Sequence, residues 1–321
     1  MREIAGWTLF AVWIAALAAA PFLGDNYTVR IAISIVMFSA LAQSWNFIGG
    51  FTGYPSLSTA AFFGIGAYVG AIAQRNGVPL VLAWALAVIA VAAFAALLGA
   101  VILRLRGHYF AIGSIAIVEI ARLIASSWSE VTGGGNGLNV PLMKGGPEVV
   151  SMFVLYAMMA VLLMAVAATA LVARGRLGFG LRCIEQNEDA ADMVGIDTTR
   201  YKVAAFVLSA VFCAAVGAIY ASWVGYIDPT DSFSILLTLK APVMALLGGA
   251  GTVLGPVAGA GAFVLLEEIF WANFLEWNRA ILGGVIVVLI FFLPGGLLGL
   301  RLAGLGARKP TPPPATAETP R

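Results

Sequence analysis

Long apolar stretches alternate with short polar connections along the chain. Seven stretches of more than 20 residues contain no Asp, Glu, Lys or Arg: 4–24, 31–74, 76–103, 149–173, 203–227, 241–266 and 280–300. About 20 helical residues span the roughly 30 Å hydrocarbon core of a bilayer, so each stretch can cross it and 31–74 can cross it twice. The pattern predicts an all-α, polytopic transmembrane helical bundle.

We predict about ten spans in this bundle, with eight to ten as the range. They lie near 5–24, 30–48, 57–74, 78–102, 109–127, 149–173, 203–223, 237–250, 254–270 and 281–300. The first is expected to stay uncleaved, because its apolar run exceeds the roughly 7–15 residues of a signal-peptide core. The glycines of 237–270 leave open one broken or re-entrant element in place of two spans.

Basic residues indicate the orientation of the bundle. With the N-terminus inside, 12 of the 18 Lys and Arg residues fall at cytoplasmic positions, five fall outside or at the outer edge, and Arg122 falls within a span. This excess predicts that both the N- and C-termini are cytoplasmic. Residues 1–306 then form the transmembrane domain. The proline-rich segment 307–321 cannot bury a core and is predicted to be a disordered cytoplasmic tail.

Composition excludes several classes of function. Hydrophobic residues make up 61% of the chain and charged residues 11%, against about 45–50% and 25% in soluble domains. A net charge of +2 without a basic cluster excludes nucleic acid as a partner. One histidine and two cysteines cannot form a zinc or haem site, and no Gly-Lys dipeptide is present for a phosphate-binding loop. We therefore expect no enzyme, no metal site and no cofactor in this chain.

Small residues recur every four positions in two places. The first set is Ser56, Ala60 and Gly64, followed by Tyr68, and the second is Gly251, Gly255 and Gly259. Each set lies on one helix face if the helix continues through it, and such faces let helix backbones approach closely in lipid. Static packing is one interpretation of these sets. The other is that they line or gate a translocation pathway.

Two charged residues fall within the fifth predicted span. Glu119 and Arg122 are three positions apart and so share a helix face. Each alone would cost about 2.5–3.5 kcal/mol at the bilayer centre, so we expect them to pair and to face inward. A structural ion pair and a role in transport both fit this position. The spans offer little else to relay protons, which counts against an ion-coupled carrier.

The segment 174–202 is the longest polar connection and is predicted to be cytoplasmic. It carries five basic and five acidic residues. Leu181, Ile184, Ala191 and Val194 recur at helical spacings and predict one short amphipathic helix that ends at Gly195. A helix that binds a membrane surface normally has a basic polar face. The polar face here is acidic, which favours a protein partner.

Motifs in this segment carry a resemblance to a known family. Asp189-Ala190-Ala191, followed after three residues by Gly195, resembles the EAA-x-x-x-G loop of ABC importer permeases, with Asp in place of Glu. The chain also resembles the branched-chain amino-acid permeases of the LivM type in five segments: 61–68, 107–112, 181–191, 195–202 and 247–256. Cys183, and the lack of the Leu-Pro that follows the EAA loop in other importer families, are departures.

The resemblance implies a type II ABC importer permease in the bacterial cytoplasmic (inner) membrane. Its implied partners are a homologous LivH-like permease, two cytoplasmic ATPase subunits that bind ATP and Mg, and an extracytoplasmic substrate-binding protein. The loop helix would insert into a groove on an ATPase and couple ATP-driven closure to the permease. Ten residues are expected at this contact: Leu181, Ile184 and Val194 as anchors, Arg182, Glu185, Glu188 and Asp189 for orientation, and Ala190, Ala191 and Gly195 of the motif.

The resemblance therefore implies a permease subunit that translocates branched-chain or related hydrophobic amino acids. Related permeases carry urea, amides or aromatic acids, so these substrates stay open. An ion-coupled secondary transporter is the alternative mechanism, and it would take up substrate into liposomes without ATP. A membrane scaffold without transport would show no dependence on substrate.

Overall fold

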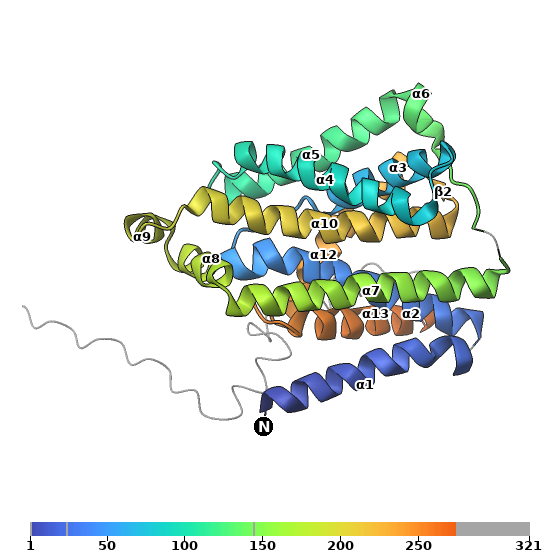
Figure 1. The fold of residues 1–321 in the computed structure, drawn as a ribbon, viewed down its shortest axis with the longest axis horizontal. Helices are drawn as coiled ribbons and strands as arrows, with labels where there is room; N and C mark the ends of the chain where they lie inside the picture. Colours follow the sequence, from blue (N-terminus) through green and yellow to red (C-terminus); the bar gives the residue numbers. More distant parts are fainter. Residues whose placement is uncertain (1, 24, 144, 274–321) are drawn as a thin grey trace, which may run out of the picture.

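The fold is a bundle of helices that run side by side along the long axis of the molecule (Figure 1). The structure is a computed structural model, and it describes residues 2–23, 25–143 and 145–273. The predicted tenth span, 281–300, and the predicted tail, 307–321, lie outside the described residues. The prediction of an all-helical polytopic fold is confirmed for the part that is described.

Nine helices lie where nine spans were predicted on the described residues. They are α1 (Arg2–Leu23), α2 (Asn26–Trp45), α3 (Thr59–Arg75), α4 (Leu80–Ile102), α5 (His108–Ser127), α7 (Pro147–Arg174), α10 (Thr198–Val224), α12 (Ile235–Gly248) and α13 (Gly255–Asn273). Six segments of the described chain are long and apolar enough to cross a membrane: α2 with the π-helix η1 (Asn46–Gly50), α4, α5, α7, α10, and α11 (Pro229–Ser232) with α12.

The region 237–270 forms two helices rather than one broken element. α12 ends at Gly248, residues 249–254 form a turn, and α13 packs back against α12. This close packing depends on small residues, because a β-carbon at Gly259 would collide with the backbone oxygen of Met244. The eighth and ninth predicted spans are therefore separate helices that form a hairpin.

The centre of the bundle is formed by α2, α3 and α10. α10 packs along α3 and α4, while α2 contacts α7, α13 and α10. Gly66 of α3 lies against the backbone of Ala214, and Gly217 of α10 lies against the backbone of Phe63. Because these positions lack β-carbons, the two helix backbones approach closely. Such close packing stabilises helix association in lipid, where burial of apolar side chains gives no driving force.

The two ends of the bundle differ in structure. At one end lie the short helices α8 (Arg176–Gln186) and α9 (Glu188–Met193), close to the start of α10 (Figure 1). At the other end lie α6 (Ser129–Thr132), η2 (Gly134–Asn136) and the strands β1 (Leu138–Asn139) and β2 (Tyr226–Ile227). The strands pair antiparallel, with Leu138 opposite Ile227, and so tie the loop after α5 to the end of α10.

Candidate functional site

The segment 174–202 folds into two short helices, so the prediction of a single helix is wrong. Asn187 separates α8 from α9 with an extended backbone (φ −164°, ψ 111°). Its side chain accepts a hydrogen bond from the Ala190 backbone N–H at 3.0 Å and caps the start of α9. Gly195 follows α9 with φ +86°, in the left-handed region that favours glycine.

The apolar stripe of this segment divides between the inside and the outside of the chain. Leu181, Ile184 and Ala191 are buried against the rest of the chain, so their side chains cannot anchor an external partner. The interpretation of Leu181 and Ile184 as anchors is therefore wrong. The exposed large apolar side chains are instead Phe179, Met193, which is 82% exposed, and Val194, which is 74% exposed. Phe179 and Met193 were missed because they fall off the helical stripe.

The polar residues of α8 and α9 have different surroundings. Arg182, Glu185, Asp189 and Ala190 are exposed, and the Arg182 guanidinium lies over the ring of Phe51 at 5.7 Å. Glu188 is turned inward, and its side chain is only 14% exposed. The residues predicted to orient one contact therefore point in two directions.

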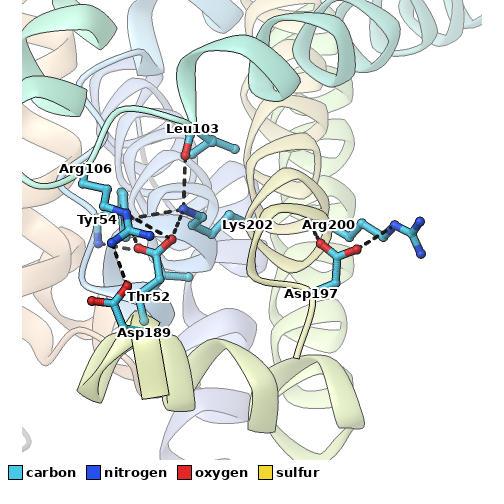
Figure 2. Close-up of polar contacts among 9 residues, drawn as sticks. Thr52, Tyr54, Leu103, Arg106, Asp189, Asp197, Arg200 and Lys202 are labelled. Carbon is cyan, nitrogen blue, oxygen red and sulfur yellow. Dashed lines mark hydrogen bonds and ion pairs between the residues drawn. The ribbon is translucent and has the colours of Figure 1, made fainter. Parts of the chain in front are cut away.

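A buried cluster surrounds Lys202, which pairs with Glu188, and was not predicted from the sequence (Figure 2). Lys202 of α10 is 2% exposed and pairs with the Glu188 carboxylate at 2.6 Å. The Lys202 ammonium also donates to the Leu103 carbonyl at 3.1 Å and to the Tyr54 hydroxyl at 3.3 Å. The Tyr54 hydroxyl in turn donates to Glu188. Every polar neighbour of the buried ammonium thus accepts a hydrogen bond, as a buried charge requires.

Arg106 extends this cluster to the surface. Its guanidinium donates to the Asp189 carboxylate at 2.8 Å and lies 4.0 Å from the Glu188 carboxylate. Arg106 belongs to the turn between α4 and α5, so the second acidic residue of α9 is also tied to that turn. Sequence spacing gives no signal for the contact between Arg106 and Asp189, because the two residues are 83 positions apart.

The cluster changes the acidity of its members. Burial raises the pKa of Glu188, but hydrogen bonds from Lys202 and Tyr54 and the positive charges of Lys202 and Arg106 outweigh it, so the net pKa is lowered. Burial and the neighbouring Glu188 carboxylate raise the pKa of Tyr54. Near neutral pH, Glu188 is therefore ionised and Tyr54 is neutral.

The first small-residue set is only partly helical. α3 begins at Thr59, so Ser56 lies in the connection before it. Ala60, Gly64 and Tyr68 do share a buried face of α3. Gly64 and Tyr68 both contact Phe233, whose ring stacks on Tyr68 with centroids 5.9 Å apart. Other residues of the same chain therefore cover this face of α3.

The second small-residue set is interrupted as well. Gly251 lies in the turn before α13 with φ +76°, so it does not share the helix face of Gly255 and Gly259. Its backbone N–H donates to the Asn46 side chain at 2.7 Å, and the Thr252 carbonyl accepts from the same side chain at 2.9 Å. Asn46 thus fastens this turn to the π-helix that follows α2.

Glu119 and Arg122 form the expected ion pair on α5, with Arg122 Nε 3.0 Å from the Glu119 carboxylate. Their side chains are 43% and 33% exposed in the single chain. The pair therefore lies on the outer surface of the described chain, whereas the sequence predicts that it faces inward.

Comparisons with known proteins identify the family. The family described as branched-chain amino acid transport system / permease component matches residues 27–290. The chain belongs to this family. The high-affinity branched-chain amino acid transport system permease protein LivM of Escherichia coli K12 is 29% identical, over 90% of this chain and 74% of its own length.

Two further relatives match a shorter part of the permease. LivH, a permease protein of the same transport system in Escherichia coli K12, is 27% identical over 41% of this chain and 43% of its own length. The autoinducer 2 import system permease protein LsrC of Yersinia enterocolitica is 28% identical over 41% of this chain and 38% of its own length. No solved structure shows a significant match.

Family membership settles the general role of the permease. It is a multi-pass membrane subunit of a bacterial ABC importer, and its task is transport rather than catalysis. Within the described residues, no three His, Cys, Asp or Glu side chains gather where they could hold a metal ion. Systems of this kind combine permeases with partner subunits, as the LivM and LivH relatives imply.

Proposed function

We propose that this permease translocates branched-chain or related hydrophobic amino acids, powered by ATP that two cytoplasmic ATPase subunits hydrolyse. The observation that carries the proposal is the pair α8 and α9, which stands at one end of an apolar bundle in a chain of this permease family (Figure 1). We place this end in the cytoplasm with both termini. We assign the chain ten spans in the type II arrangement, the last at 281–300.

The ATPase contact is placed on the exposed side of α8 and α9. Three large apolar side chains stand out from these short polar helices: Phe179, Met193 and Val194. Apolar side chains on a short helix suit a hydrophobic groove on a partner, with neighbouring charges fixing the orientation. Arg182, Glu185, Asp189 and Ala190 provide that exposed polar rim, while Gly195 ends the contact surface.

A second, LivH-like permease is proposed to cover α5. The outward surface of α5 is apolar apart from the half-exposed Glu119 and Arg122 pair. Charged side chains in spans are costly when they face lipid and almost always face protein or a water-filled cavity. A partner permease against α5 would remove the pair from lipid and place it at the boundary between the two subunits, beside the translocation pathway.

The opposite end of the bundle is proposed to receive the extracytoplasmic substrate-binding protein. The strands β1 and β2 hold the loop after α5 in place, and a polar hollow of about 440 Å³ opens beside them. Arg75, Glu130, Asn136 and Asn139 are among the residues that line it. Charged and amide groups around a hollow suit a polar, transient contact with a partner.

Reconstitution in lipid nanodiscs with the partner subunits tests the function. We expect leucine, isoleucine or valine, delivered by the binding protein, to raise ATP hydrolysis several-fold and to accumulate in proteoliposomes only with ATP. Uptake by the purified permease alone under an ion gradient would contradict the proposal and favour a secondary transporter. Stimulation by urea, amides or aromatic acids alone would contradict the substrate class, as the LsrC relative illustrates for other solutes.

A double substitution tests the ATPase contact proposed for α8 and α9, which we call the coupling helices. Met193→Asp with Val194→Asp places two charges on the surface proposed to enter the ATPase groove, so ATPase recovery with the permease should fall at least tenfold. Leu142→Asp is the matched control, because Leu142 is also 82% exposed but lies near the opposite end. Equal recovery of ATPases with both variants would refute the placement of the contact.

A further inference from the structure

Four separate parts of the chain meet at one buried ammonium group. Lys202 near the start of α10 contacts Glu188 of α9, Leu103 at the end of α4 and Tyr54 in the connection between η1 and α3. We propose that Lys202 and Glu188 form a rigid clamp that transmits movement of α9 to these transmembrane elements. The proposal, which rests on the proposed function, makes both residues positioning residues for coupling and keeps them out of the ATPase contact.

The burial of the clamp supports rigidity. Lys202 is enclosed by Glu188, the Tyr54 hydroxyl and the Leu103 carbonyl, and its ammonium also lies 4.8 Å from the centre of the Tyr54 ring. A long, flexible lysine loses several rotatable bonds when it is held this way, and the geometry persists only because each contact supports the others. Arg106 adds a second tie between α9 and the α4–α5 turn through Asp189.

Both coupling helices meet the same short connection. Arg182 of α8 covers the ring of Phe51, and Glu188 of α9 accepts from the Tyr54 hydroxyl. The side chain of Glu185 lies beside Gly53. Residues 51–54 therefore receive contacts from both helices, so a displacement of α8 and α9 as one unit reaches the membrane region at this connection.

The connection continues into contacts with three transmembrane helices. The Trp45 indole N–H donates to the Ser56 carbonyl at 2.7 Å, and the Leu57 backbone N–H donates to the Ser114 hydroxyl of α5 at 2.8 Å. The backbone N–H of Ala60 donates to Thr238 of α12 at 3.1 Å. These bonds join the clamp to α2, to the buried side of α5, and to the α12–α13 hairpin.

A nearby ion pair provides a matched control. Arg200, two residues before Lys202, pairs with Asp197 at 2.9 Å, but its side chain is exposed and, among the described residues, this pair stays within the start of α10 (Figure 2). Both pairs unite an acidic residue with a basic one at the start of α10. Of these two pairs, the clamp alone links α9 to other segments, so comparing the two variants distinguishes transmission from the loss of a local charge pair.

The transport test uses neutral double variants so that no buried charge is left alone. In the reconstituted complex, Lys202→Met with Glu188→Gln should retain the ATPases but lower the amino acid taken up per ATP hydrolysed at least fivefold. Asp197→Asn with Arg200→Met should stay within twofold of wild type, and Lys202→Arg should recover part of the ratio. An unchanged ratio in the clamp variant would overturn the proposal.

Hydrogen exchange on the permease alone tests the clamp without relying on the function. We expect amides of residues 188–195 to exchange at least tenfold faster in the clamp variant and at the wild-type rate in the control variant. Unchanged protection of these amides would show that the pair does not hold α9. Failure of the proposed function would instead be seen in the wild-type complex, where branched-chain amino acids would not raise the rate of ATP hydrolysis.

Discussion

Asn46 fastens the α12–α13 turn to the end of α2, and its replacement by leucine should destabilise the fold. The side chain is fully buried, accepts from the Gly251 N–H at 2.7 Å and donates to the Thr252 carbonyl at 2.9 Å. Leucine has a similar size but leaves both backbone groups without these partners. Gly251 is only partly buried and Thr252 is exposed, so each backbone group loses less than the about 1–3 kcal/mol of a fully buried unpaired group, and we expect about 1–2 kcal/mol for the two together. Hydrogen bonds between transmembrane helices average about 0.6 kcal/mol each, which agrees with this figure.

Denaturant unfolding in detergent micelles measures this loss. Ser39→Ala is the matched control, because Ser39 lies on α2, is fully buried and has a hydroxyl with no hydrogen-bond partner among the described residues. The control should unfold within about 0.5 kcal/mol of wild type, the size of a neutral substitution. If Asn46→Leu fell within that same margin, the two hydrogen bonds would not hold the turn and the reasoning would be refuted.

Two further predictions concern charge. Arg122→Leu leaves Glu119 without its partner at the proposed permease boundary and should strongly reduce recovery of the second permease, because a lone charge would be enclosed there. Glu119→Leu with Arg122→Leu should restore recovery, and equal recovery of both variants on size-exclusion chromatography would contradict the boundary. The lowered pKa of Glu188 contributes stability that is complete above its unfolded value near 4.5 and is lost as pH falls through the folded value. The difference in unfolding free energy between wild type and Glu188→Gln should therefore be largest near pH 7 and shrink below about pH 4.5, and a difference that stays constant to pH 3 would contradict it.

The helices of the bundle were predictable because a bilayer permits few alternatives. Backbone polar groups must pair within the segment, so an uncharged stretch of sufficient length predicts a helix wherever it occurs. The break at Asn187 was also visible in principle, since an asparagine followed by Glu188 and Asp189 is a signal for a helix start. The helical spacing of the apolar residues on both sides of the break concealed it.

The clamp could not be predicted from local sequence. Lys202 lies 148 residues from Tyr54 and 99 from Leu103, so no local spacing links them. The small-residue sets failed for a related reason. A spacing of four predicts a shared face only where the helix continues, and α3 and α13 begin after Ser56 and Gly251.

The two buried polar links, at Lys202 and at Asn46, can form at different times during synthesis of the chain. Every partner of Lys202 precedes it, so the clamp can close as soon as α10 has been made. Asn46 waits for Gly251, which follows 205 residues later, or about 10–40 s at usual translation rates. Until then its amide lacks its final partners, so an unfinished chain displays in the bilayer a polar group that the finished chain conceals.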